Sequence, residues 1–162
     1  METKKRNEQE LYNLVRALSW NDAFGCFTRP GMEKLAWPDI ADRAEWIVYF
    51  DVDFMHKINE ENHGYDFADS VIKNVLGQIR INDLAAGQWK SGDEFIIVMT
   101  RTEDRESIDS AGLIRRLTDA FTRWNMSATF AAVPVISKVL AVNVQPAIDE
   151  VYKIKNARGD LR

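Results

Sequence analysis

A tight turn with two adjacent carboxylates, set between apolar segments, is the feature that most constrains the fold of this chain. The turn is Ser91-Gly92-Asp93-Glu94-Phe95. Gly and Asp favour the backbone conformations of tight hairpin turns, so we predict a β-hairpin over residues 86–100. A second apolar run, residues 46–50, ends in Asp51-Val52-Asp53. The chain therefore places carboxylates at the ends of two predicted strands.

Carboxylates at the ends of buried strands need partners, because an ionised Asp or Glu that leaves water unpaired costs free energy. Asp51 with Asp93 or Glu94 offers the hard oxygen ligands that Mg²⁺ or Mn²⁺ prefers. A zinc site is disfavoured because His56 and His63 are the only histidines and form no Cys/His cluster. Taken alone, each acidic motif is also compatible with an ordinary solvated turn.

Composition limits the class of protein. The 162 residues are 46% hydrophobic and 28% charged, which suits one domain with one core. Lys and Arg number 21 against 25 Asp and Glu, so no basic field favours a long nucleic acid or an anionic membrane as partner. Cys26 is the only cysteine, and no apolar segment suits a signal peptide or a membrane span. We expect a cytoplasmic protein for which a nucleotide remains a compatible ligand.

The order of predicted elements defines the fold class. Apolar periodicity predicts a helix over 7–18, and Thr28 before Arg29-Pro30 predicts a second helix start. The following elements are strand 45–51, helix 66–80, hairpin 86–100, helix 108–124, strand 127–133 and helix 146–156. This β-α-β-β-α-β order inside flanking helices is the α+β ferredoxin-like or palm pattern. Its first and third strands are central neighbours, which would bring Asp51 beside Asp93 and Glu94.

We divide the chain into an N-terminal amphipathic helix, residues 1–20, and a catalytic domain, residues 21–162. The apolar stripe of the first helix consists of Leu11, Leu14, Val15 and Leu18. This stripe has too few heptads to favour a coiled-coil stalk, so we expect it to pack within the molecule.

Five motifs in this order resemble a GGDEF domain, the catalytic module of diguanylate cyclases. Residues 91–95 resemble the signature itself, with Ser91 in place of its first Gly. Residues 51–60 resemble the segment Asp-x-Asp-x-Phe-Lys-x-Ile-Asn-Asp, and residues 64–69 resemble Gly-His-x-x-Gly-Asp, displaced by one inserted residue. Residues 22–27 resemble the entry motif and residues 151–159 the closing helix. The motifs together span residues 22–162.

The resemblance implies roles for individual residues. Asp51, the Val52 carbonyl, Asp93 and Glu94 would form the metal site, and Asp93 and Glu94 would be catalytic. Asn59 and Asp69 would contact guanine. The remaining implied substrate-binding residues are Phe54, Met55, His56, Ser91, Gly92, Lys155 and Arg158. Arg80 and Asp83 match the product-inhibition motif in type, although a helix-terminal Arg followed by an Asn-Asp turn explains them equally well.

The implied activity is the condensation of two GTP molecules into cyclic di-GMP and pyrophosphate by a homodimer. Three departures affect this implication: His56 occupies the place of a lysine, Ala68 that of a glycine, and one residue is inserted near Asn62-His63. Two alternatives therefore stay open. One is a degenerate GGDEF domain that binds GTP or cyclic di-GMP as a signalling module, and the other is a palm cyclase that uses ATP.

Overall fold

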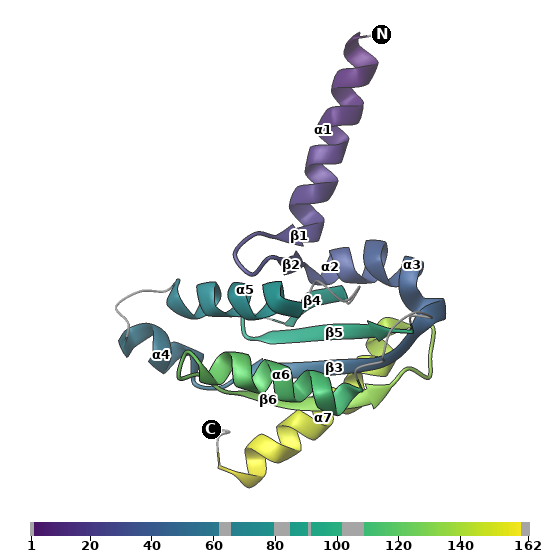
Figure 1. Ribbon diagram of the computed structural model, residues 1–162. Helices are drawn as coiled ribbons and strands as arrows, with labels where there is room; N and C mark the ends of the chain where they lie inside the picture. The colour runs from purple at the N-terminus through teal and green to yellow at the C-terminus, as the bar shows by residue number, and fades with distance from the viewer. Residues whose placement is uncertain (1, 62–65, 80–84, 91, 102–108, 160–162) are drawn as a thin grey trace.

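The computed structural model describes residues 2–61, 66–79, 85–90, 92–101 and 109–159. Its elements begin with a long helix and a two-strand hairpin, continue through a short helical segment, and end in a mixed set of strands and helices (Figure 1). In chain order they are α1 Glu2–Ser19, β1 Trp20–Asn21, β2 Cys26–Phe27, α2 Arg29–Gly31, the π-helical turn Met32–Ala36, α3 Trp37–Ile40, the 3-10 turn Ala41–Arg43, β3 Ala44–Val52, α4 Met55–Glu61, α5 Phe67–Ile79, β4 Ala85–Lys90, β5 Glu94–Thr100, α6 Ser110–Thr122, β6 Ala128–Pro134 and α7 Leu140–Ala157.

The strands form one six-stranded sheet in the order β1-β2-β4-β5-β3-β6. Strand β3 lies between β5 and β6 and pairs antiparallel with both. The predicted β-α-β-β-α-β core is confirmed, including the central position of its first and third strands. As a result, Asp51 near the end of β3 lies opposite Glu94 at the start of β5.

Strand β3 supplies side chains to a hydrophobic core on each face of the sheet, because successive side chains of a strand point to opposite faces. Phe50 is fully buried on the face covered by α5 and α6, where its ring contacts Phe95 and Phe121. Tyr49 is fully buried on the other face, in the core to which α7 contributes Val144. Figure 1 shows α5 and α6 on one side of the sheet and α7 on the other.

The last helix begins earlier than the sequence suggested. We predicted a helix over residues 146–156, whereas α7 begins at Leu140 and contains Pro146 in its interior. The Asn143 side chain accepts hydrogen bonds from the backbone N–H groups of Ile136 and Ser137, at 2.9 Å each. This buried amide stabilises the chain reversal before the helix, a contact that periodicity alone does not reveal.

Helix α1 does not pack as predicted. Its stripe residues Leu11, Leu14, Val15 and Leu18 are 61%, 56%, 41% and 62% exposed. Figure 1 shows α1 extending away from the sheet, so the expectation of intramolecular packing is wrong. The end of the helix is joined to the domain, where Thr28 donates its backbone N–H to the Ser19 carbonyl at 2.9 Å. The predicted helix start is confirmed, because the Thr28 hydroxyl also accepts from the backbone N–H of Gly31.

No helix in the part of the chain that the structure describes combines the length and apolarity needed to cross a membrane.

Candidate metal and nucleotide site

Four of the predicted site residues meet where β3 ends and β5 begins. Asp51 lies opposite Glu94, and the backbone N–H of Val52 donates to the carbonyl of Asp93 at 2.9 Å. Gly92 in the preceding turn has a φ of 62°, a left-handed conformation that glycine adopts without the steric cost of a side chain. The hairpin geometry therefore brings Asp51, Val52, Asp93 and Glu94 to one end of the sheet, as the sequence predicted.

Asp51 is the least satisfied carboxylate of this group. One of its oxygens, Oδ2, lies 3.3 Å from the Lys155 ammonium. The other, Oδ1, is buried without a hydrogen-bond partner in the described structure. Burial, together with the negative charge of Asp93, raises the pKa of Asp51 to about 6, although Lys155 acts in the opposite direction. A bound cation would supply the partner that this oxygen lacks.

Glu94 is buried and accepts a hydrogen bond from the Tyr49 hydroxyl. Burial of the tyrosine, strengthened by this bond and by the charge of Glu94, raises the pKa of Tyr49 far above its ordinary value. Tyr49 therefore remains a neutral donor. Sequence reasoning missed this residue because it lies in the apolar run before Asp51, where an aromatic residue looks like an ordinary core residue.

Asp93 is half-buried beside these groups. Burial and the neighbouring charge of Glu94 raise its pKa. The carboxylates thus repel one another in the free protein, which is the electrostatic condition that a divalent cation relieves.

Asp53 forms the centre of a second, fully satisfied network that the sequence analysis did not assign. Its carboxylate is buried and accepts hydrogen bonds from the hydroxyls of Ser127 and Thr129, both at 2.8 Å. The same carboxylate lies 3.2 Å from the Lys155 ammonium and 3.6 Å from the Arg158 guanidinium. The two predicted phosphate-binding residues, Lys155 and Arg158, are therefore brought to the site by α7 and positioned by Asp53. The sequence feature that could have indicated this network is the presence of a second carboxylate, Asp53, two residues after Asp51.

The segment after β3 carries further predicted substrate-binding residues. Phe54 is exposed and has a φ of 54°, an unusual value for a residue with a side chain, and it turns the chain from β3 into α4. Met55 and His56 form the first turn of α4. Short helix α4 was not predicted from the sequence.

The two predicted guanine-contacting residues are brought together. Asn59 on α4 accepts a hydrogen bond through Oδ1 from the backbone N–H of Ala68, at 3.0 Å. Asp69 follows Ala68 in the first turn of α5, and burial and the nearby Asp66 raise its pKa. Their contact with a base stays a prediction.

The predicted residues Arg80, Asp83 and Ser91 lie outside the described residues, as does the inserted position near Asn62-His63.

The donor set would suit a magnesium or manganese ion that takes some of its ligands from the protein and the others from a substrate. Within the described residues, no three Asp, Glu, His or Cys side chains lie close enough to hold a metal ion by themselves. Mg²⁺ commonly binds through one or two carboxylates, with water and substrate phosphates as its other ligands. The unpartnered oxygen of Asp51 and the adjacent Asp93 fit that pattern, with the Val52 carbonyl as a further hard ligand.

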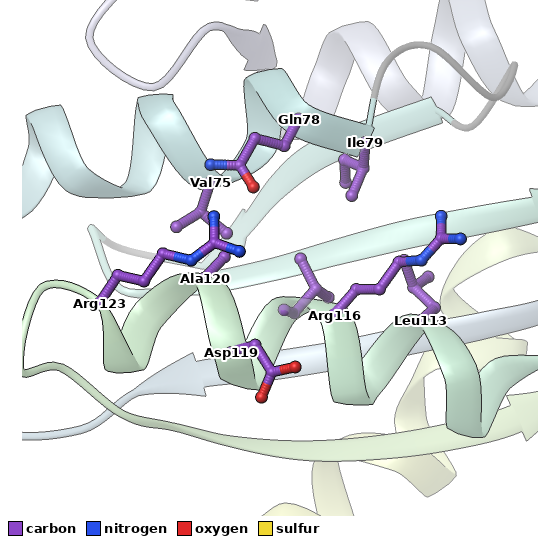
Figure 2. A pocket seen from close by; sticks show the side chains of 9 residues that line it. Val75, Gln78, Ile79, Leu113, Arg116, Asp119, Ala120 and Arg123 are labelled. Carbon is purple, nitrogen blue, oxygen red and sulfur yellow. The ribbon is translucent and has the colours of Figure 1, made fainter.

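A separate pocket of about 230 Å³ lies between α5 and α6 (Figure 2). Its apolar lining is Val75, Ile79, Leu113, Leu117 and Ala120, and its polar lining is Gln78, Arg116, Asp119 and Arg123. In Figure 2 the Arg123 side chain extends from α6 toward Gln78 of α5. Ile79, the last residue of α5, is part of this lining.

Comparison with known proteins gives structural matches only. No protein-family model matches this sequence, and no curated protein is similar enough in sequence to count as a match. A microbial GGDEF domain studied with cyclic di-GMP has a TM-score of 0.70 at 16% identity, over 89% of this chain and 94% of that one. The coiled coil and GGDEF domain of DgcB from Caulobacter crescentus, in complex with cyclic di-GMP, gives 0.69 at 12% identity, over 98% and 90%. This chain has the GGDEF fold.

A third match with the GGDEF fold is the diguanylate cyclase SiaD from Pseudomonas aeruginosa, in complex with its activator SiaC. Its TM-score is 0.66 at 17% identity, over 96% of this chain and 66% of that one. The predicted α+β fold class and the resemblance to GGDEF domains are thereby confirmed. At these identities the GGDEF fold is what the likeness establishes, and the residue roles rest on the geometry of the site.

Proposed function

We propose that this chain is a diguanylate cyclase-type nucleotidyl cyclase that condenses two GTP molecules into cyclic di-GMP and releases pyrophosphate. The observation that carries the proposal is the buried, unpartnered oxygen of Asp51 beside Asp93, at the strand ends of a GGDEF fold. Complexes of structural neighbours with cyclic di-GMP support the choice of product.

Asp51, the Val52 carbonyl and Asp93 would hold Mg²⁺ or Mn²⁺, with the second oxygen of Glu94 available as a further ligand. The bound metal would align the attacking 3′-hydroxyl and stabilise charge on the reacting phosphate and the leaving pyrophosphate. Lys155 and Arg158 would contact the substrate phosphates from the end of α7, because Asp53 keeps both cations beside the metal-binding carboxylates.

Asn59 and Asp69 would select guanine. A carboxylate accepts from guanine N1–H and N2–H, whereas adenine offers no matching pair of donors. A site built around a base's hydrogen bonds rejects the wrong base because buried polar groups are then left unpaired. The backbone at Phe54 and Met55 and the turn at Ser91 and Gly92 would line the triphosphate, and His56 would supply a pH-dependent charge there.

Catalysis would require a homodimer, because each protomer would bring one GTP to a two-fold symmetric site. The exposed apolar stripe of α1 supports association between copies of this chain. Arg80 and Asp83 would bind the cyclic di-GMP product. The guanidinium groups of Arg116 and Arg123 in the pocket between α5 and α6 would attract an anionic ligand.

A second candidate function is a receptor for GTP or cyclic di-GMP without turnover. The observation that favours it is that two predicted site carboxylates already have protein partners, Glu94 with Tyr49 and Asp51 with Lys155. ATP as substrate would require that Asn59 and Asp69 do not contact the base.

One assay separates these functions. The purified chain is incubated with Mg²⁺ and each nucleoside triphosphate, and products are identified by mass. We expect cyclic di-GMP from GTP alone and no product from Asp93→Asn, whereas Asp39→Asn, a change at an exposed position on α3, should retain activity. Absence of product from every nucleotide, together with calorimetric binding of cyclic di-GMP, would establish the receptor function instead. A cyclic product from ATP would contradict the assignment of Asn59 and Asp69.

A further inference from the structure

Lys155 occupies a position between two carboxylates that have different surroundings. Its side chain is 12% exposed, and its ammonium lies 3.3 Å from Asp51 Oδ2 and 3.2 Å from Asp53 Oδ1. Helix α7, which carries Lys155, packs on the sheet through the fully buried Val144 and Val151. The ammonium is therefore presented by an anchored element rather than by a loop.

The two carboxylates differ in how much they depend on Lys155. Asp53 has three other partners: the hydroxyls of Ser127 and Thr129 donate hydrogen bonds to it, and the guanidinium of Arg158 forms an ion pair with it. Within the described residues, Asp51 forms an ion pair only with Lys155, through Oδ2. Its other oxygen, Oδ1, has no hydrogen-bond partner there. Asp53 can thus hold Lys155 at the site whether or not Lys155 contacts Asp51.

We propose that Lys155 is an internal counter-ion that competes with the divalent cation for Asp51, and that nucleotide phosphates relieve this competition. The inference rests on the metal site of the proposed function and adds to it a coupling between metal and nucleotide. Two cations at one carboxylate repel each other, so each weakens the binding of the other. Phosphate oxygens supply new acceptors for the ammonium, which turns from Asp51 while Asp53 retains it.

The first consequence is a weak metal affinity in the nucleotide-free protein. Substitution of Lys155 by an uncharged side chain of similar length should then tighten metal binding, although it removes a positive charge that the phosphates would use. A residue with only a structural role in the α7 contact would not produce this gain. Competition predicts tighter metal binding by the variant, whereas loss of the fold would weaken metal binding. The direction of the change therefore distinguishes the two explanations.

The test is a titration of the full chain with Mn²⁺ at pH 8 in the absence of nucleotide, followed by electron paramagnetic resonance of the free ion. We expect Lys155→Met to tighten Mn²⁺ binding about tenfold, which corresponds to about 1.4 kcal/mol. Lys155→Gln provides a second, polar variant, and circular dichroism checks that both are folded. Lys153→Met, which removes an exposed charge from the same helix, is the matched control and should leave the affinity unchanged.

A second titration measures the coupling. A GTP analogue with a methylene bridge between its α- and β-phosphates, present at saturation, should strengthen Mn²⁺ binding to the native protein more than to Lys155→Met, after correction for metal bound by free analogue.

Equal Mn²⁺ affinity in the native chain and both Lys155 variants would overturn the inference and leave the proposed cyclase activity intact. No Mn²⁺ binding to any variant would overturn both the inference and the metal site. Tighter binding by the variants in a chain without turnover would retain the inference and reject the cyclase activity.

Discussion

At the scale of single residues, Asp51 connects the proposed chemistry to the stability of the folded protein. Its pKa is raised to about 6 in the fold, mainly by burial and then by Asp93, from an ordinary value of 3.8. The folded state therefore binds a proton at this group more tightly than the unfolded chain does. The stabilising contribution is fully present below about pH 4 and is lost as the pH rises through about 6.

We predict that Asp51→Asn stabilises the metal-free protein at pH 7 but not at pH 4. The expected gain at pH 7 is about 1–3 kcal/mol, because the amide removes the cost of an ionised, partly unpartnered oxygen. Urea unfolding of both proteins at several pH values measures the difference, and the subtraction removes the contributions of other titrating groups. If the difference in free energy of unfolding between the two proteins were the same at pH 4 and pH 7, Asp51 would have the same pKa in the folded protein as in the unfolded chain.

At the scale of elements, two glycines with different surroundings show where the backbone is tightly packed. A Cβ at Gly31 in α2 would lie 2.1 Å from the Ser19 carbonyl oxygen at the end of α1. A Cβ at Gly77 in α5 would meet no atom within 4 Å. The junction between α1 and α2 is thus closed by backbone contact, whereas the exposed surface of α5 leaves room for a side chain.

We predict opposite effects for the matched changes Gly31→Ala and Gly77→Ala. Gly77→Ala should stabilise the protein by about 0.5–1 kcal/mol, because alanine loses less backbone entropy than glycine in a helix. Gly31→Ala should destabilise it by about 1–3 kcal/mol, because a backbone contact cannot move as a flexible side chain can. Urea midpoints compare the two variants. A neutral Gly31→Ala would mean that the end of α1 separates from α2 at little cost.

At the scale of the whole molecule, α1 and the rest of the chain contribute unequally to folding. The apolar stripe of α1 is exposed, and the two hydrophobic cores lie against the faces of the sheet. The predicted division into residues 1–20 and 21–162 agrees with this arrangement but stays a prediction until the parts are separated.

We predict that deletion of residues 1–14 changes the free energy of unfolding by less than about 0.5 kcal/mol, because residues 7–14, the part of this segment whose side chains the structure describes, are exposed. Met32→Ala is the comparison, since Met32 is fully buried and its loss should cost about 2–5 kcal/mol. Both are measured by urea unfolding at a concentration where the chain is monomeric by sedimentation. A deletion as destabilising as Met32→Ala would place α1 within the cooperatively folding unit.

The sequence by itself determined the order of the core elements and the end of the sheet at which the acidic residues gather. The continuous apolar run at residues 46–50 and the Gly-Asp turn at 92–93 are local signals, because the tendency to form a buried strand and the conformation of a turn depend on neighbouring residues. Together with the palm pattern they were sufficient to place Asp51 beside Asp93 and Glu94.

The tertiary structure decided which partner each polar group has. The bond from Tyr49 to Glu94, the network of Asp53 with Ser127, Thr129 and Arg158, and the contacts of Lys155 join residues that are 29 to 105 positions apart in the sequence. The exposure of the apolar stripe of α1 could likewise not be predicted from the sequence. An apolar periodicity predicts an amphipathic helix but does not indicate what covers its apolar face. Hydrogen bonds and burial depend on distances between elements, and those distances are set only when the elements pack.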